Sequence, residues 1–187
     1  MKEGGRLMTE IAKARTGGNH NQKDSPENPI TYLKEHGINR VFRFILTHPD
    51  MDHMDGIKLL FSKFSPYNFW DTDNTEEKEN FENGPYSLDD WEFYKSIRDK
   101  KITPCTRLTL YDGSEGKYYN KNESGESGGN GLQILAPTAE LLKTANESRH
   151  FNDTSYVILY KSGKKKILFC GDADENTWEH ILKNHEE

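Results

Sequence analysis

Apolar and polar residues are unevenly distributed along the chain. Large apolar residues are dense at 41–47, 132–136, 154–160 and 166–170. They are scarce at 1–29, 71–90 and 112–131. Short apolar runs rich in β-branched and aromatic residues predict buried strands, and helical patterns between them favour an α/β fold. We interpret the polar stretches as insertions in a folded core.

Helix boundaries are readable at several places. Asn28 is a good N-cap, Pro29 suits the first helical position and Gly37 suits the stop, which predicts a helix over 30–36. Apolar residues at helical spacing predict a second helix over about 54–64. Further helices are expected from the Ser87 capping pattern to Arg98, and over 138–146 and 174–183. A short helix is also expected at 7–14.

The strands are expected to form one mixed sheet with helices packed on it. Residues 41–47 are mostly apolar and end directly on His48. Residues 154–160 and 166–170 predict a hairpin that turns at 162–164. Strands are also expected at 107–111 and 132–136. By contrast, 65–86 reads as a long polar loop and 113–131 as a flexible insertion.

Length and composition indicate one domain in a reducing compartment. The 187 residues are 33% hydrophobic and carry a net charge of −6, with a mean hydropathy of −0.95. We predict a polar segment over 1–29 and a domain over 30–187, with insertions near 65–100 and 112–131. An acidic chain lacks the basic footprint of a general nucleic-acid binder. The two cysteines are far apart in the sequence, which fits a reducing cytosol. The sequence shows no apolar run long enough to cross a membrane and no secretory signal, so we expect a cytoplasmic protein without a membrane span.

The main chemical signal is a tight His/Asp cluster that follows the strand at 41–47. It comprises His48, Asp50, Asp52 and His53. Imidazole and carboxylate groups are preferred ligands of zinc and manganese, and such close spacing lets neighbouring side chains reach two ions. The alternative is a polar surface turn in which Asp50 or Asp52 caps the next helix.

Two later segments carry weaker signals. Asp172 follows Gly171 at the end of a strand expected to be buried, where open α/β sheets collect functional groups. In the segment 149–155, either His150 or Asn152 is a candidate ligand, and a solvated turn is the alternative. His180 and His185 are expected to be solvent-facing residues of the last helix.

These three segments, in this order, resemble the metallo-β-lactamase superfamily. Its motif H-x-H-x-D-H follows a strand, and a further ligand and a Gly-Asp pair follow later strands. Here Asp50 replaces the second histidine, which resembles the branch containing the metallo-β-lactamase domain of the DNA-uptake protein ComEC. The resemblance covers residues 30–184 and implies an αββα sandwich, partial because the opening hairpin and the last His-bearing loop are not recognisable.

The resemblance also implies roles for these residues. His48 and Asp50 would face a first metal, with Asn152 or His150, while Asp52 and His53 would face a second. Asp172 would bridge both, and a metal-activated water would be the nucleophile, with Asp52 and Asp172 as the catalytic carboxylates.

The expected activity is metal-dependent hydrolysis of a phosphodiester in nucleic acid or a nucleotide, with up to two Zn²⁺ or Mn²⁺ ions. The alternative is a non-catalytic, degenerate or truncated module that keeps the fold. Unpaired strand edges would favour a homo-oligomer.

Overall fold

The computed structural model describes residues 27–79, 81 and 85–185, so the helix predicted at 7–14 lies outside the described residues. The chain separates into two units, Met1–Asn39 and Arg40–Glu187. In the first, helix α2 spans Pro29–Glu35, and the Asn28 side chain accepts hydrogen bonds from the backbone N–H groups of Ile30 and Thr31. The predicted helix and its cap are therefore confirmed.

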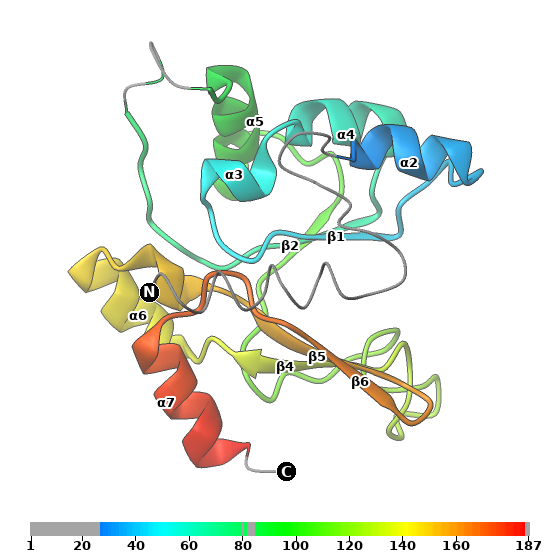
Figure 1. Cartoon of the computed structure of the whole chain (residues 1–187), viewed down its shortest axis with the longest axis vertical. Helices are drawn as coiled ribbons and strands as arrows, with labels where there is room; N and C mark the ends of the chain where they lie inside the picture. The colour runs from blue at the N-terminus through cyan, green and yellow to red at the C-terminus, as the bar shows by residue number, and fades with distance from the viewer. Residues whose placement is uncertain (1–26, 80, 82–84, 186–187) are drawn as a thin grey trace, which may run out of the picture. The chain divides into compact units, whose positions relative to one another are not determined.

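Two three-stranded sheets form the second unit (Figure 1). Strands β1 (Arg43–Ile45), β2 (Asn68–Trp70) and β3 (Thr106–Leu108) are parallel in that order. Strands β4 (Leu132–Ala136), β5 (Val157–Ser162) and β6 (Lys165–Phe169) are antiparallel in that order. Parallel and antiparallel pairings thus occupy separate sheets, where the sequence predicted one mixed sheet. The α/β class is confirmed.

The helices of this unit connect and cover the strands. They are α3 (Met51–Met54), α4 (Ile57–Phe64), α5 (Leu88–Arg98), α6 (Ala139–Ser148), the 3-10 helix η1 (Phe151–Thr154) and α7 (Glu175–Asn184). The helix predicted over 54–64 is wrong at its start, because Gly56 adopts φ +81 and separates α3 from α4. A left-handed residue cannot continue a right-handed helix.

Strand β2 lies inside the stretch that the sequence predicted to be a polar loop. Its Phe69 and Trp70 side chains are fully buried. Three residues are too few to show an alternating pattern, and the flanking residues are polar, so the strand carries little periodic signal. The predicted insertion at 113–131 is anchored by Tyr119, which is buried against Trp70.

The core of this unit has three apolar layers, because neighbouring residues of a strand face opposite sides of its sheet. Phe44 and Phe69 pack with helices α3, α4 and α5. Their neighbours Ile45 and Trp70 face the second sheet, where they meet Ile134 and Ile158 among others. On the far side of the second sheet, β4 and β5 pack against Ile181 and Trp178 of α7. The order is helices, sheet, sheet, helix.

Strand β6 departs from its expected burial. The sequence predicted a buried strand, but Ile167, Leu168 and Phe169 are 48%, 42% and 53% exposed. β6 pairs with β5 alone among the strands described, which makes it an edge of its sheet. Separately, none of the helices in the described ranges has the length and apolar character needed to cross a bilayer.

Candidate metal centre

Three strand ends meet beside the 48–53 cluster. Tyr156, just before β5, donates its backbone N–H to the carbonyl of Thr47, just after β1, at 2.9 Å. The backbone N–H of Asp172, just after β6, lies 3.3 Å from Ser155 Oγ. These contacts bring residues that are more than a hundred positions apart in the sequence to one place.

Gly171 permits this close approach. Its φ is +53, and a Cβ added there would lie 2.8 Å from Thr47 Cβ and 3.1 Å from Ser155 Cβ. Any side chain at this position would therefore clash and would also hold a strained backbone. The glycine lets the β6 end lie against the β1 end, which delivers Asp172 to the cluster.

His48 is the most deeply placed member of the cluster, at 1% exposure. Its Nδ1 lies 3.3 Å from Thr47 Oγ1, and its Nε2 is buried with no hydrogen-bond partner among the described residues. A buried polar atom without a partner carries a desolvation cost of about 1–3 kcal/mol. Such an atom in a ring already held through its other nitrogen has the arrangement of a metal ligand.

Asp172 and His53 complete a three-residue group around that nitrogen. Asp172 carboxylate oxygens lie 3.9 Å from His48 Nε2 and 3.2 Å from His53 Nε2. The two imidazole centroids are 4.3 Å apart. One ligand atom from each residue lies within 4.8 Å of the others. Ligands of one tetrahedral zinc ion are separated by roughly 3.4 Å, so these three side chains could hold a single divalent cation.

Asp50 and Asp52 lie at the rim of this group. Asp50 occupies the N-cap position of α3 but makes no capping hydrogen bond, so the alternative in which it caps the helix is wrong. Its Oδ2 lies 3.3 Å from His48 Nε2. Asp52 is more exposed, and its Oδ2 lies 3.6 Å from His53 Nε2. His48 and His53 therefore lie beside Asp172, while Asp50 and Asp52 each lie beside one of these histidines.

A lysine that the sequence did not single out also enters the site. Lys78 Nζ lies 2.6 Å from Asp50 Oδ1 and 2.6 Å from Glu76 Oε1. The nearby imidazole of His48, and then Lys78, hold the pKa of Asp50 well below its usual range, against the opposing effect of burial. Burial raises the pKa of Glu76. Nothing in the polar run 71–79 distinguishes Lys78 from a surface residue, because its role depends on how that segment folds.

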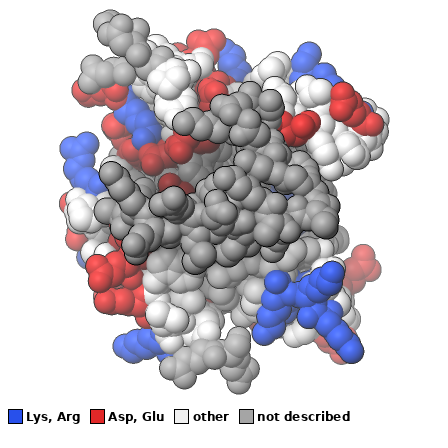
Figure 2. Space-filling view, viewed as in Figure 1, with Lys and Arg blue, Asp and Glu red and all other residues white. Residues whose placement is uncertain are grey.

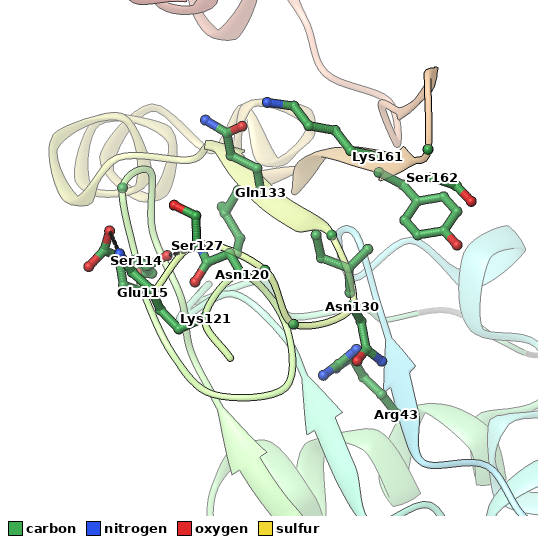
Figure 3. Close-up of a pocket in the computed structure, with 18 residues that line it drawn as sticks. Arg43, Ser114, Glu115, Asn120, Lys121, Ser127, Asn130, Gln133, Lys161 and Ser162 are labelled. Carbon is green, nitrogen blue, oxygen red and sulfur yellow. Dashed lines mark hydrogen bonds and ion pairs between the residues drawn. The ribbon is translucent and has the colours of Figure 1, made fainter. Parts of the chain in front are cut away.

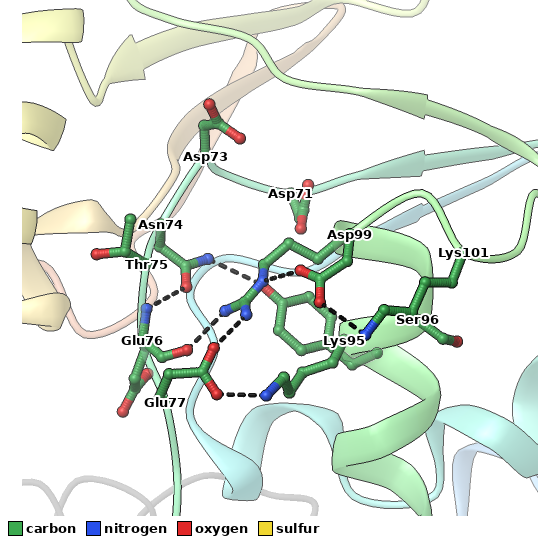
Figure 4. Close-up of polar contacts among 12 residues, drawn as sticks. Asp71, Asp73, Asn74, Thr75, Glu76, Glu77, Lys95, Ser96, Asp99 and Lys101 are labelled. Carbon is green, nitrogen blue, oxygen red and sulfur yellow. Dashed lines mark hydrogen bonds and ion pairs between the residues drawn. The ribbon is translucent and has the colours of Figure 1, made fainter.

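That segment leaves β2 and runs past α5 through a set of paired polar side chains (Figure 4). Asp71 accepts a 2.6 Å hydrogen bond from Arg107 Nε, and Asn74 Nδ2 lies 2.8 Å from the Tyr94 hydroxyl. Burial raises the pKa of Asp71 to about 6, against the opposing effect of Arg107. These contacts fix the path that carries Glu76 and Lys78 to the site.

The two candidate ligands of the segment 149–155 lie on the surface. His150 and Asn152 are exposed at the start of η1, and His150 is not in the three-residue group. A role for Asn152 as ligand stays a prediction. Asp153, between them and β5, is buried and accepts hydrogen bonds from Asn176 Nδ2 and Thr177 Oγ1 at 2.7 and 3.0 Å. It therefore joins η1 to the first turn of α7.

Two further features lie outside the 48–53 cluster. A cavity of about 920 Å³ is lined by β4, β5 and the glycine-rich loop before them, with Arg43 and Lys161 at its walls (Figure 3). It contains none of the cluster residues. A smaller hollow of about 450 Å³ does reach the cluster, at Asp50, Asp52 and Lys78.

His180 and His185 correct another prediction. They were expected to face solvent, but their side chains are only 18% and 22% exposed, and both lie against Asp112. Residues that are distant in sequence and joined only by folding give no local motif, so the sequence could not reveal this group.

The chain matches no protein-family model, no curated protein sequence and no solved structure in comparisons with each. The interpretation of the site therefore depends on the residues and their geometry.

Proposed function

We propose that this chain is a metal-dependent hydrolase of the metallo-β-lactamase type that cleaves phosphodiester bonds in nucleic acid or nucleotides. The observation that carries the proposal is His48 Nε2, which is buried, has no hydrogen-bond partner within the described part of the chain, and lies near Asp50 and Asp172. The order helices, sheet, sheet, helix supports the αββα sandwich of that family. The positions of the 48–53 cluster and of Asp172, each just after a strand, also support this fold.

The proposed metal ligands are His48, Asp50, Asp52, His53 and Asp172, with Asn152, or alternatively His150, as a further ligand. The donor set of imidazoles and carboxylates suits up to two Zn²⁺ or Mn²⁺ ions. When bound, these ions would supply Lewis-acid activation of water and of the substrate phosphate. The unpaired nitrogen of His48 and the carboxylate of Asp172 between two imidazoles fit such a group.

Each side chain of the site would have its own role in binding or in proton transfer. Thr47 fixes the ring of His48, and Asp172 lies between His48 and His53 to bridge them. Asp52 has an exposed carboxylate beside His53 and would accept a proton from the attacking water. Lys78, at the hollow that reaches the cluster, would contact the negative charge of the substrate.

The chain is acidic overall, so a polymeric anionic substrate would gain little long-range attraction to it. The molecule carries a net charge of −6. In Figure 2, Lys and Arg side chains gather around the tip of the β5–β6 hairpin, where Lys164, Lys165 and Lys166 are exposed. A few surface charges give weak, salt-sensitive attraction to a phosphate backbone. We therefore infer that the substrate is recognised mainly at the metal site.

The second candidate function is a non-catalytic module that keeps the fold and binds at most one metal. It is favoured by the ion pair between Lys78 and Asp50, because this lysine already neutralises one proposed ligand. In this alternative, His48, His53 and Asp172 would hold a cation that orders the strand ends and does not support turnover.

The test combines metal content with turnover in the full chain. Metal-free protein is dialysed against Zn²⁺ or Mn²⁺, its bound metal is measured by mass spectrometry, and cleavage of bis-p-nitrophenyl phosphate and single-stranded DNA is followed. We expect stoichiometric metal and metal-dependent cleavage. Asp172→Asn should lower kcat/KM by on the order of 100-fold or more. His48→Ala should do the same, and His36→Ala serves as the control, because His36 is exposed and belongs to neither His/Asp group.

Each other result has a defined meaning. Absence of stoichiometric metal in the wild type would make the assigned site wrong. Metal binding with no cleavage of either substrate would favour the non-catalytic module. Equal cleavage by wild type and Asp172→Asn would show that the activity belongs to a contaminant. Because His48 is buried, folding of His48→Ala is checked by circular dichroism, while the part-exposed Asp172 provides the safer variant.

A further inference from the structure

A second His/Asp group lies at the far end of α7 and shares no residue with the 48–53 cluster. Asp112 follows β3, and its backbone N–H donates to the carbonyl of Pro137, next to the end of β4. His180 is on α7, and His185 comes directly after that helix. The backbone N–H of His185 donates to the carbonyl of Ile181, so His185 caps the last turn of α7, and its ring lies near that of His180.

The two imidazoles face one carboxylate from two sides. His180 Nε2 lies 2.8 Å from Asp112 Oδ2, and His185 Nε2 lies 3.0 Å from Asp112 Oδ1. The ring centroids are 6.0 Å apart. One ligand atom from each of the three residues lies within 4.8 Å of the others. This is a two-imidazole, one-carboxylate donor set on part-buried side chains.

Hydrogen bonding to Asp112 explains the position of His180 but not that of His185. His180 Nε2 and Asp112 form a hydrogen bond of ordinary length. His185 Nε2 is buried and lies close to Asp112, yet it has no hydrogen-bond partner among the residues that the structure describes. A buried imidazole nitrogen that lies close to a carboxylate without a hydrogen bond to it keeps the cost of its lost hydration. It is well placed as a ligand that shares a cation with that carboxylate.

The other nitrogen of His180 also has a partner. Its Nδ1 lies 3.1 Å from the side-chain amide of Asn184, one helical turn later. Histidines that bind metals generally hydrogen-bond through their second nitrogen, which fixes the ring and its tautomer. The group that faces Nδ1 is the amide nitrogen of Asn184, which also donates to the backbone carbonyl of His180 at 2.8 Å. In the metal-bound tautomer Nδ1 carries the proton, so the amide would rotate, give up its bond to that carbonyl and accept the proton through its oxygen.

We propose that Asp112, His180 and His185 form a second divalent-cation site, with zinc as the best match to its two nitrogen ligands and one oxygen ligand. A cation there ties the end of α7 to the segment after β3. Because these residues are separate from the 48–53 cluster, this inference does not depend on the proposed hydrolase activity.

The test removes the first cluster and asks whether zinc still binds. In the full chain, His53→Gln/Asp172→Asn should retain one equivalent of Zn²⁺, measured by calorimetry and by the visible absorption of Co²⁺ in its place. Adding His180→Gln/His185→Gln should weaken that binding by on the order of 100-fold or more, since loss of a ligand costs at least as much as loss of its outer partner. Asn184→Ala alone should weaken it by about 10-fold.

Two results would overturn the proposal. One is no zinc binding by the His53→Gln/Asp172→Asn protein. The other is zinc binding that persists unchanged after both later histidines are replaced. His36→Gln in the same background is the matched control for loss of an exposed histidine outside both groups, and it should leave the affinity unchanged. Folding of each variant is checked by circular dichroism, and His185 is well suited to substitution because it lies beyond the last helical residue.

Discussion

Gly171 shows how a residue without a side chain can position a site. Its contacts with Thr47 and Ser155 leave no room for a Cβ, and its φ is +53. We expect Gly171→Ala to lower the free energy of unfolding by about 2 kcal/mol, because it combines backbone strain with steric overlap. It should also weaken metal binding at the 48–53 cluster, because Asp172 would move. Urea denaturation and metal titration measure the two effects.

Gly163 provides the control for this prediction. It lies in the β5–β6 turn with φ +58, and a Cβ there would meet no atom within 4 Å. Gly163→Ala therefore introduces backbone strain alone, expected at about 1 kcal/mol, and should leave metal binding intact. If both variants lose the same stability and bind metal equally, the close approach at Gly171 does not position Asp172.

Among the elements, helix α4 depends on a residue of another helix. Asp90 of α5 accepts hydrogen bonds from the backbone N–H groups of Gly56 and Lys58, at 3.0 and 2.9 Å. These are donors that the first turn of α4 cannot satisfy internally. Asp90→Ala should cost about 2 kcal/mol and lower Tm by roughly 5 °C, measured by thermal denaturation.

The neighbouring Asp89 tests whether the effect is specific. It pairs with Lys58 on the surface, and both side chains are more than half exposed. Exposed pairs contribute little, so Asp89→Ala should change stability by less than about 0.5 kcal/mol. Equal losses from the two variants would contradict the capping role of Asp90.

Asp90 also illustrates what the sequence could and could not predict. The Ser87 pattern predicted the start of α5, which is confirmed, but Ser87 makes no side-chain capping bond. Elements with local signals, such as the Asn28 cap, the β4 strand and the β5–β6 hairpin, could be predicted because their causes lie within a few residues. Strand β2 and the link between α4 and α5 depend on contacts made only after folding.

Some residues of the candidate site could likewise be predicted from the sequence, and others could not. The 48–53 cluster and Asp172 stand out in the sequence because they follow apolar runs that end abruptly. Lys78 and the Asp112 group have no such local context, since each becomes meaningful only beside residues far away in the chain. The exposure of β6 could not be predicted either, because the sequence of an apolar strand does not show whether the strand lies at the edge or in the middle of its sheet.

For the molecule as a whole, stability should depend on pH through Asp71. Burial raises its pKa in the folded state to about 6, above its ordinary value of 3.8. The folded state therefore binds this proton more tightly than the unfolded state. Its stabilising contribution is full below pH 3.8 and is lost as the pH rises through about 6. The loss is at most roughly 3 kcal/mol.

Urea denaturation between pH 4 and 8 measures this effect by comparison with Asp71→Asn, which cannot titrate. The wild type should lose stability relative to the variant as the pH rises, with little further change above pH 7. Asp73→Asn is the control, because Asp73 lies near the same Arg107 but is exposed. A wild type that gains stability relative to Asp71→Asn over this range would mean that Arg107 outweighs burial.

The lysine at the proposed metal site has one more consequence. In this structure the Lys78 ammonium group is the counterion of Asp50 and Glu76, so the acidic site is partly neutral without any metal. Lys78 holds Oδ1 of Asp50, while Oδ2 lies 3.3 Å from His48 Nε2 and is the oxygen that a cation beside His48 would use. An ion bound there would lie close to a fixed positive charge, and the repulsion between the two would take up part of its intrinsic affinity. Weakly binding ions would then be excluded, and the ammonium group would stay beside the bound ion, where an anionic substrate could meet both charges.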